Sequence, residues 1–129
     1  MTRIEKLAAK LDKGEAVILL RPENRRYFTG MTTSNGLLLV TADHAWFFTD
    51  FRYIMAAKSI VKNPITVALF DGSHAATVKK TINSLSEKIK RIYFEDTYLS
   101  YFAAKAFMEE MSDIDFVAGE AMVAAGDII

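Results

Sequence analysis

Two segments concentrate the polar and charged residue types that could do chemistry. In residues 22–30, two adjacent arginines precede two aromatic residues and a glycine, and the polar stretch 32–36 follows. We expect this segment to form a loop that exposes side chains at the rim of a sheet. In residues 49–53, Asp50 is placed to cap a helix and Arg52 to pair with an acid. Turn formation and helix capping are an alternative interpretation of both segments.

No other pattern in the sequence indicates an active site. The glycine cradles that hold nucleotide phosphates and the G-x-S-x-G nucleophile elbow are absent from the sequence. His44 and His74 lie outside any zinc-ligand spacing, so we expect His44 in an exposed turn and His74 in the first turn of a helix. Glu95 and Asp96 lie at the junction between an expected strand and an expected helix, where acids stabilise the start of the helix. We therefore predict no catalytic residue and no metal ligand in this chain.

The composition is typical of one soluble domain. The 129 residues are 51% hydrophobic and 25% charged, and 16 basic residues balance 16 acidic ones. Because the net charge is zero, we expect no nucleic-acid partner and no anionic membrane partner. There is no cysteine, which excludes thiolate chemistry, and no run of about 20 apolar residues long enough to span a bilayer. The N-terminus lacks the apolar stretch of a signal peptide, so a cytoplasmic location is predicted.

Strand and helix patterns alternate along the chain. The spacing of apolar residues predicts helices at 4–11, 52–61 and 75–89, and a fourth that begins at Asp96 or Thr97 with Leu99, Phe102, Ala103, Ala106 and Phe107 on its apolar face. Short apolar runs predict six strands, at 16–20, 36–40, 45–49, 65–70, 91–95 and 114–117. Residues 41–44 have the length of a hairpin loop. This order predicts an α/β fold with a mixed sheet of about six strands covered by helices.

Several ordered motifs carry a family resemblance. They are P-E-N-x-x-Y-[LF]-[ST]-G at residues 22–30, G-L-L-L-V at 36–40, T-D-x-R-Y at 49–53, F-E-D-x-x-L-S-Y at 94–101 and the opening R-I-E-K-L at 3–7. Together they resemble the N-terminal domain of the creatinase/prolidase/Xaa-Pro aminopeptidase family. The resemblance covers residues 3–118 and implies helices on both faces of the mixed sheet.

The resemblance implies a two-domain protein of which this chain is the non-catalytic part. Residues 1–118 would form the N-terminal domain, and 119–129 would begin the connection to a catalytic domain absent from this sequence. That absent domain would hold two divalent metal ions and hydrolyse the peptide bond before proline. The basic R-x-I-K segment of the family is not visible in residues 119–129, which departs from the pattern.

The resemblance also implies roles for particular residues. The domain would contribute to a homodimer, and the loop after the first motif would approach the active site of the neighbouring subunit and its proline-containing peptide substrate. Here that loop is Met31, Thr32, Thr33, Ser34 and Asn35. The motif residues expected to give structural support are Asn24, Tyr27, Gly30, Asp50, Arg52 and Tyr53.

Two other functions stay open at this point. The chain could be a stand-alone α/β binding or assembly module that has this fold without the hydrolase. It could also belong to a relative such as creatinase, which hydrolyses a small amidine substrate. Creatinase-like enzymes need aromatic and cationic groups in the loop, and residues 31–36 contain neither, which favours the peptidase branch.

Overall fold

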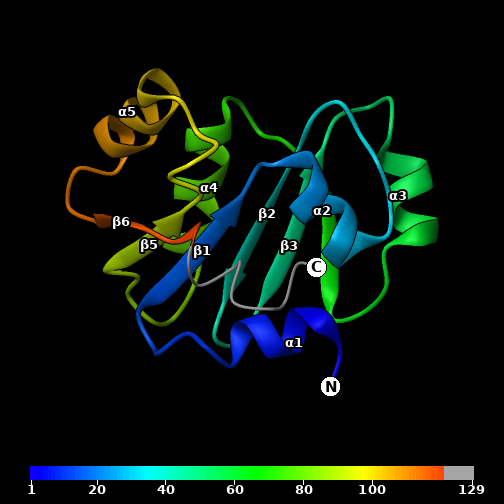
Figure 1. Cartoon of the computed structure of the whole chain (residues 1–129), viewed down its shortest axis with the longest axis horizontal. Coiled ribbons are helices and arrows are strands. Elements are labelled where there is room, and N and C mark those ends of the chain that lie inside the picture. The colour runs from blue at the N-terminus through cyan, green and yellow to red at the C-terminus, as the bar shows by residue number, and fades with distance from the viewer. Residues whose placement is uncertain (121–129) are drawn as a thin grey trace.

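The structure, a computed structural model, describes residues 1–120 as a six-stranded mixed sheet with helices on both faces (Figure 1). The helices are α1 (Arg3–Ala8), α2 (Pro22–Thr29), α3 (Ile54–Ile60), α4 (His74–Asn83) and α5 (Tyr101–Glu110). The strands are β1 (Glu15–Leu19), β2 (Gly36–Thr41), β3 (Ala45–Thr49), β4 (Ile65–Leu69), β5 (Arg91–Phe94) and β6 (Asp115–Ala118). The predicted fold class is confirmed.

The strand order across the sheet is β4-β3-β2-β1-β5-β6. Strand β2 runs antiparallel to both of its neighbours, whereas the pairs β3–β4, β1–β5 and β5–β6 are parallel. The hairpin predicted around residues 41–44 joins β2 to β3, with Val40 opposite Ala45. Because only β2 is reversed, the carboxyl ends of the other strands meet the amino end of β2 at one edge of the sheet.

Two apolar cores cover the two faces of the sheet, so each strand buries side chains on both sides. Helices α1, α2 and α3 cover one face through residues such as Leu7, Phe28 and Ala57. Helices α4 and α5 cover the other face through residues such as Val78 and Phe107. Burial on both faces explains why the central strands are nearly continuous apolar runs.

The prediction of a loop at residues 22–30 is wrong, because this segment forms helix α2. Pro22 occupies the first helical turn, where a missing N–H costs nothing. Gly30 ends the helix with φ 79° and ψ 8°, a left-handed conformation that glycine adopts without strain. The proline that interrupts the strand pattern after β1 therefore begins a helix directly.

Other predicted helix boundaries also differ from the structure. The helix predicted at 4–11 ends at Ala8, and the helix predicted at 52–61 begins at Ile54. Helix α4 ends at Asn83, and the Ser84 hydroxyl donates to the Thr81 carbonyl 2.6 Å away. Helix α5 begins at Tyr101 behind the cap Ser100, whose hydroxyl accepts from the Ala103 N–H, so neither Asp96 nor Thr97 caps it.

The later start of α5 changes which of its side chains meet the sheet. Ala104, Phe107 and Met111 are buried at helical spacing. Phe102, expected on the apolar face, is instead 84% exposed.

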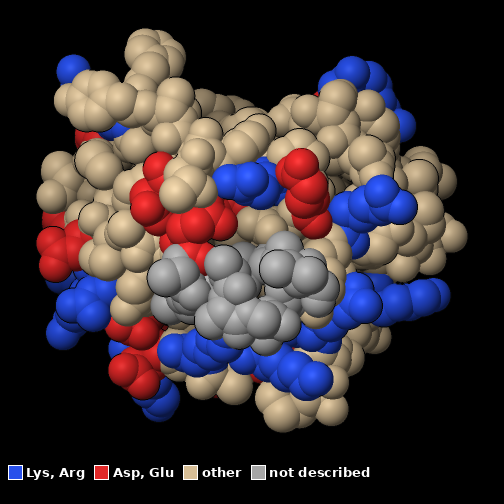
Figure 2. All heavy atoms as spheres, in the orientation of Figure 1, with Lys and Arg blue, Asp and Glu red and all other residues tan. Residues whose placement is uncertain are grey.

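Charges of both signs are spread over the surface. In the view of Figure 2, acidic groups lie beside a basic group in the upper half, and further basic groups follow the right and lower sides. In the described part of the chain, no helix is long and apolar enough to cross a bilayer.

Candidate functional site

One edge of the sheet collects the segments that carry the sequence motifs. We call it the motif edge, and it consists of residues 20–36, 49–55, 70–74 and 94–103. These segments follow β1, β3, β4 and β5 or precede β2, and the direction of β2 brings them together. The topology thus places three of the family motifs side by side, although they are far apart in the sequence.

A buried carboxylate joins the motif at 94–101 to the motif at 22–30. Glu95 is only 1% exposed, and its Oε1 accepts from the backbone N–H groups of Leu20 and Arg21, at 2.6 and 2.8 Å. Its Oε2 accepts from Nδ2 of Asn24 at 2.5 Å, and Asn24 is equally buried. Burial raises the pKa of Glu95, and the three donors oppose that effect. Glu95 therefore ties β5 to the start of α2, and not to the helix that follows it in sequence.

A second buried charge, Arg25, supports the loop between α2 and β2. Its Nε donates to the Leu20 carbonyl, and its Nη1 donates to the carbonyl and hydroxyl of Thr33, at 3.2 and 2.9 Å. The guanidinium lies against Gly36, where a Cβ would come 2.6 Å from Nη1. Burial lowers the pKa of Arg25. Sequence reasoning missed Arg25 and Glu95, since charged residues are seldom this buried.

The loop 31–35 has alternating inward and outward side chains. Met31 is buried in the core beneath α2, and Thr33 is buried against Arg25. Thr32 and Ser34 are exposed, and Asn35 is half-buried. Of the five loop residues named from the sequence, these last three can meet a ligand or partner.

The T-D-x-R-Y motif holds the outer part of this loop. The hydroxyls of Ser34 and Tyr53 share a hydrogen bond of 2.9 Å, and Nδ2 of Asn35 donates to Asp50 at 3.2 Å. Asp50 also accepts from the backbone and side chain of Arg52, the latter at 2.7 Å, which lowers its pKa to about 2. The side chain of Asp50 does not cap α3, whose N-cap is Tyr53. Its contacts instead join the turn after β3 to the loop.

Tyr27 lies away from this cluster. The guanidinium of Arg3 stacks 4.1 Å from the centre of its ring and donates to its carbonyl, so Tyr27 ties α1 to α2. Gly30 closes α2 one residue before the loop begins. Gly30 thus adjoins the loop, whereas Tyr27 contacts α1.

His74 completes the motif edge from the start of α4. Its Nε2 lies 3.0 Å from Oδ1 of Asn35, and its ring stacks on Phe70 with centres 4.3 Å apart. Burial and the nearby charge of Arg25 lower the pKa of His74. Because Oδ1 of Asn35 can only accept, Nε2 of His74 donates this hydrogen bond. His44 lies in the exposed turn after β2, as predicted.

A cavity of about 400 Å³ opens among these groups. Its lining residues are Leu20, Arg25, Ser34, Asn35, Gly36, His74, Tyr98, Leu99, Ser100 and Ala103. They come from three of the four segments of the motif edge, 20–36, 70–74 and 94–103, and none of them is acidic. This cavity is the candidate functional site.

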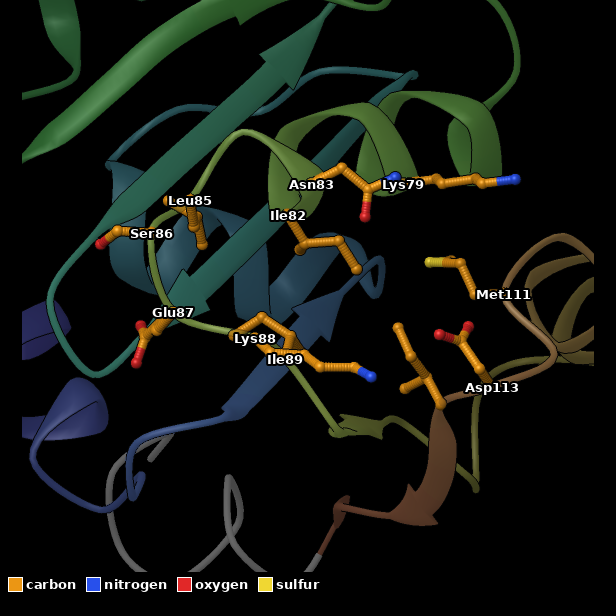
Figure 3. A pocket seen from close by; sticks show the side chains of 11 residues that line it. Lys79, Ile82, Asn83, Leu85, Ser86, Glu87, Lys88, Ile89, Met111 and Asp113 are labelled. Carbon is orange, nitrogen blue, oxygen red and sulfur yellow. The ribbon is translucent and has the colours of Figure 1, made fainter.

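Another cavity, of about 310 Å³, lies at the opposite edge of the sheet (Figure 3). Ile82 and Met111 point toward its centre, whereas the polar ends of Lys79 and Glu87 point away from it. It contains no residue of the family motifs. It is therefore a weaker candidate for a functional site.

Within residues 1–120, no three His, Asp or Glu side chains lie together where they could hold a metal ion.

Comparison with known proteins decides the family. The creatinase/prolidase N-terminal domain family matches residues 3–129 of the sequence. The chain belongs to this family. The uncharacterized peptidase YqhT of Bacillus subtilis is 34% identical over 103 residues, 80% of this chain. A putative Xaa-Pro aminopeptidase of Mycoplasma pneumoniae is 30% identical over 102 residues. This chain spans only 28% and 27% of the lengths of these relatives.

Solved structures show the same creatinase/prolidase N-terminal domain. A Xaa-Pro dipeptidase from Bacillus anthracis superposes with a TM-score of 0.83 at 26% identity, covering 95% of this chain and 34% of its own. The N-terminal domain of the cytoplasmic peptidase PepQ from Mycobacterium tuberculosis superposes with a TM-score of 0.78 at 25% identity. The PepQ structure consists almost entirely of this domain, since the match covers 96% of its chain. The fold is therefore the domain that precedes the remainder of longer peptidases.

Proposed function

We propose that this chain is the non-catalytic N-terminal domain of a Xaa-Pro peptidase. The domain contributes to subunit association and presents loop 31–35 at the active site of the neighbouring subunit. The full-length protein hydrolyses the peptide bond before proline, with two divalent metal ions held by residues beyond the described part of the chain. Relatives described as Xaa-Pro peptidases support this activity, and the cytoplasmic peptidase among the structural neighbours supports a cytoplasmic location.

The observation that carries the proposal is the way in which the motif edge holds the loop. Arg25 supports the loop from inside, and Tyr53 and Asp50 hold it from outside, so Ser34 is exposed on a fixed backbone. A fixed, exposed polar loop can orient a substrate with little loss of conformational entropy.

Exposed apolar side chains flank this loop. Phe51 and Met55 are 84% and 80% exposed on one side, and Tyr101 and Phe102 are 79% and 84% exposed on the other. Large apolar side chains gathered at one edge indicate a protein interface. A partner seated on both groups would cover the loop between them.

The first test is an activity assay on the full-length product of the gene. With divalent metal it should hydrolyse Xaa-Pro dipeptides or longer Xaa-Pro peptides, should not hydrolyse matched peptides with alanine in place of proline, and should lose activity with a chelator. The 129-residue chain alone should be inactive. Absence of hydrolysis by the metal-loaded protein, or a gene that ends at Ile129, would contradict the proposal.

The interface is tested by sedimentation velocity of the full-length protein. Phe51→Ser together with Phe102→Ser should shift the dimer toward monomer at micromolar concentration. Met108→Ser is the control, because Met108 is a partly exposed apolar residue two turns further along α5. Unchanged sedimentation of the double variant would refute the assigned surface.

A further inference from the structure

The candidate cavity has the donors of an anion site, and no acidic side chain lines it. Arg25 lines it and is 5% exposed, and its Nη2 has no hydrogen-bond partner among residues 1–120, whereas Nε and Nη1 are occupied. A guanidinium whose Nη2 is not hydrogen-bonded to protein can donate to the oxygens of a carboxylate or a phosphate. Two carboxylates, Glu95 and Glu23, interact electrostatically with Arg25, and Glu95 already accepts three hydrogen bonds.

The start of α5 meets the same cavity. Ser100 and Ala103 line it, and α5 has no acidic residue in its first turn. The Ser100 hydroxyl is used by the Ala103 N–H, which leaves the backbone N–H groups of Tyr101 and Phe102 without an acceptor in the described chain. Free N–H groups at the start of a ten-residue helix favour an anion.

His74 also lines the cavity, and the positive charge of Arg25 acts on its ring. Its Nε2 is hydrogen-bonded to Asn35, so Nδ1 is the ring nitrogen that does not take part in that bond. A bound anion would offset the charge of Arg25 and favour the imidazolium form.

We propose that this cavity binds a small oxyanion, a carboxylate or a phosphate group, between Arg25 and the start of α5. The inference goes beyond the proposed function, because it concerns a pocket of this chain alone and does not depend on peptidase activity. The bound group would lie directly behind Ser34 and Asn35 and would link ligand binding to the loop.

The test is an NMR titration of the 129-residue chain at pH 7.5 and constant ionic strength, with inorganic phosphate in one arm and acetate in the other. We expect saturable shifts of the amides of Ser34, Tyr101 and Phe102. Saturation by phosphate only assigns a phosphate group, and saturation by acetate assigns a carboxylate. Linear shifts without saturation to 100 mM in both arms would overturn the proposal.

A matched pair of variants places the site. Ser100→Asp keeps a good N-cap and adds a negative charge at the cavity, so affinity should fall at least tenfold. Thr2→Asp makes the same change at the N-cap of α1, far from the cavity, and should bind as the wild type does. Equal affinity of both variants would refute the location. A readout without variants is the pH titration of the His74 ring, whose midpoint should rise in a saturating concentration of the anion that binds. An unchanged midpoint in that anion would also refute the location.

Discussion

The buried contact between Asn24 and Glu95 makes a quantitative prediction. Asn24→Ala removes one of three donors to a carboxylate that is 1% exposed. Loss of a hydrogen bond to a buried charged group costs about 1.5–3 kcal/mol. Alanine is the better helix former by about 0.5 kcal/mol, which offsets part of that cost in α2. The expected loss of unfolding free energy is about 2 kcal/mol at neutral pH, or about 8 °C in Tm for a domain of this size.

The pH dependence gives this prediction a sign. Burial raises the pKa of Glu95 in the folded state, so its stabilising contribution is complete below the unfolded pKa and is lost as pH rises through the folded pKa. Asn24 donates to the ionised form, and its removal raises that pKa further. The difference between wild type and Asn24→Ala should therefore be largest near pH 7.5 and shrink toward pH 4.

The assay is urea unfolding followed by circular dichroism at pH 7.5 and pH 4, with equal m-values required of both proteins. Asn83→Ala is the control, since Asn83 is an exposed helical asparagine at the end of α4, and it should change stability by less than about 0.5 kcal/mol. A loss below about 0.5 kcal/mol for Asn24→Ala, or a loss that grows toward pH 4, would refute the assigned role of Glu95.

Three further predictions concern the motif edge. Gly30→Ala should cost about 1 kcal/mol in urea unfolding, because φ is 79° and no atom crowds the new methyl group. The Asp50 carboxyl should titrate near pH 2 by carbon NMR and move up in Arg52→Gln, and its contribution to stability should disappear as pH falls through 4 toward 2. The His74 ring should titrate below its ordinary value of about 6.5, so folding should weaken as pH falls through that ordinary value; a midpoint at or above 6.5 would contradict the assigned burial.

The sheet was predictable because its signals are local. The apolar runs of β2 and β3 and the short loop between them specify a hairpin without reference to the rest of the chain. The order of strands and helices then leaves few ways to cover both faces.

Helix α2 was missed because Pro22 follows β1 directly and suggests a break. The spacing of Pro22 and Gly30 was the available signal, since proline begins helices and glycine ends them. The start of α5 was placed too early because Asp96, Thr97 and Ser100 are all good N-caps, and only packing of Ala104 and Phe107 on the sheet selects Ser100.

The site itself depends on contacts that no local pattern predicts. Asn24 and Glu95 are 71 residues apart in sequence, and Asn35 and His74 are 39 apart. The motifs identified the family, whereas the cavity and its buried Arg25 follow only from the topology that brings four segments to one edge. The role of loop 31–35 at the active site of a neighbouring subunit stays a prediction. Of the connection expected at 119–129, residues 121–129 lie outside the described residues.

Complementation between two inactive full-length variants tests the central claim most directly. One variant carries Ser34→Trp in the loop, and the other lacks a metal ligand in the catalytic region. Asp43→Trp, at the exposed turn of the opposite edge, is the control and should keep full activity. If the loop serves the neighbouring subunit, mixing the two inactive proteins at equal amounts should restore about a quarter of wild-type activity, since half of the dimers are mixed and each holds one complete site. No recovery in confirmed mixed dimers would contradict the account.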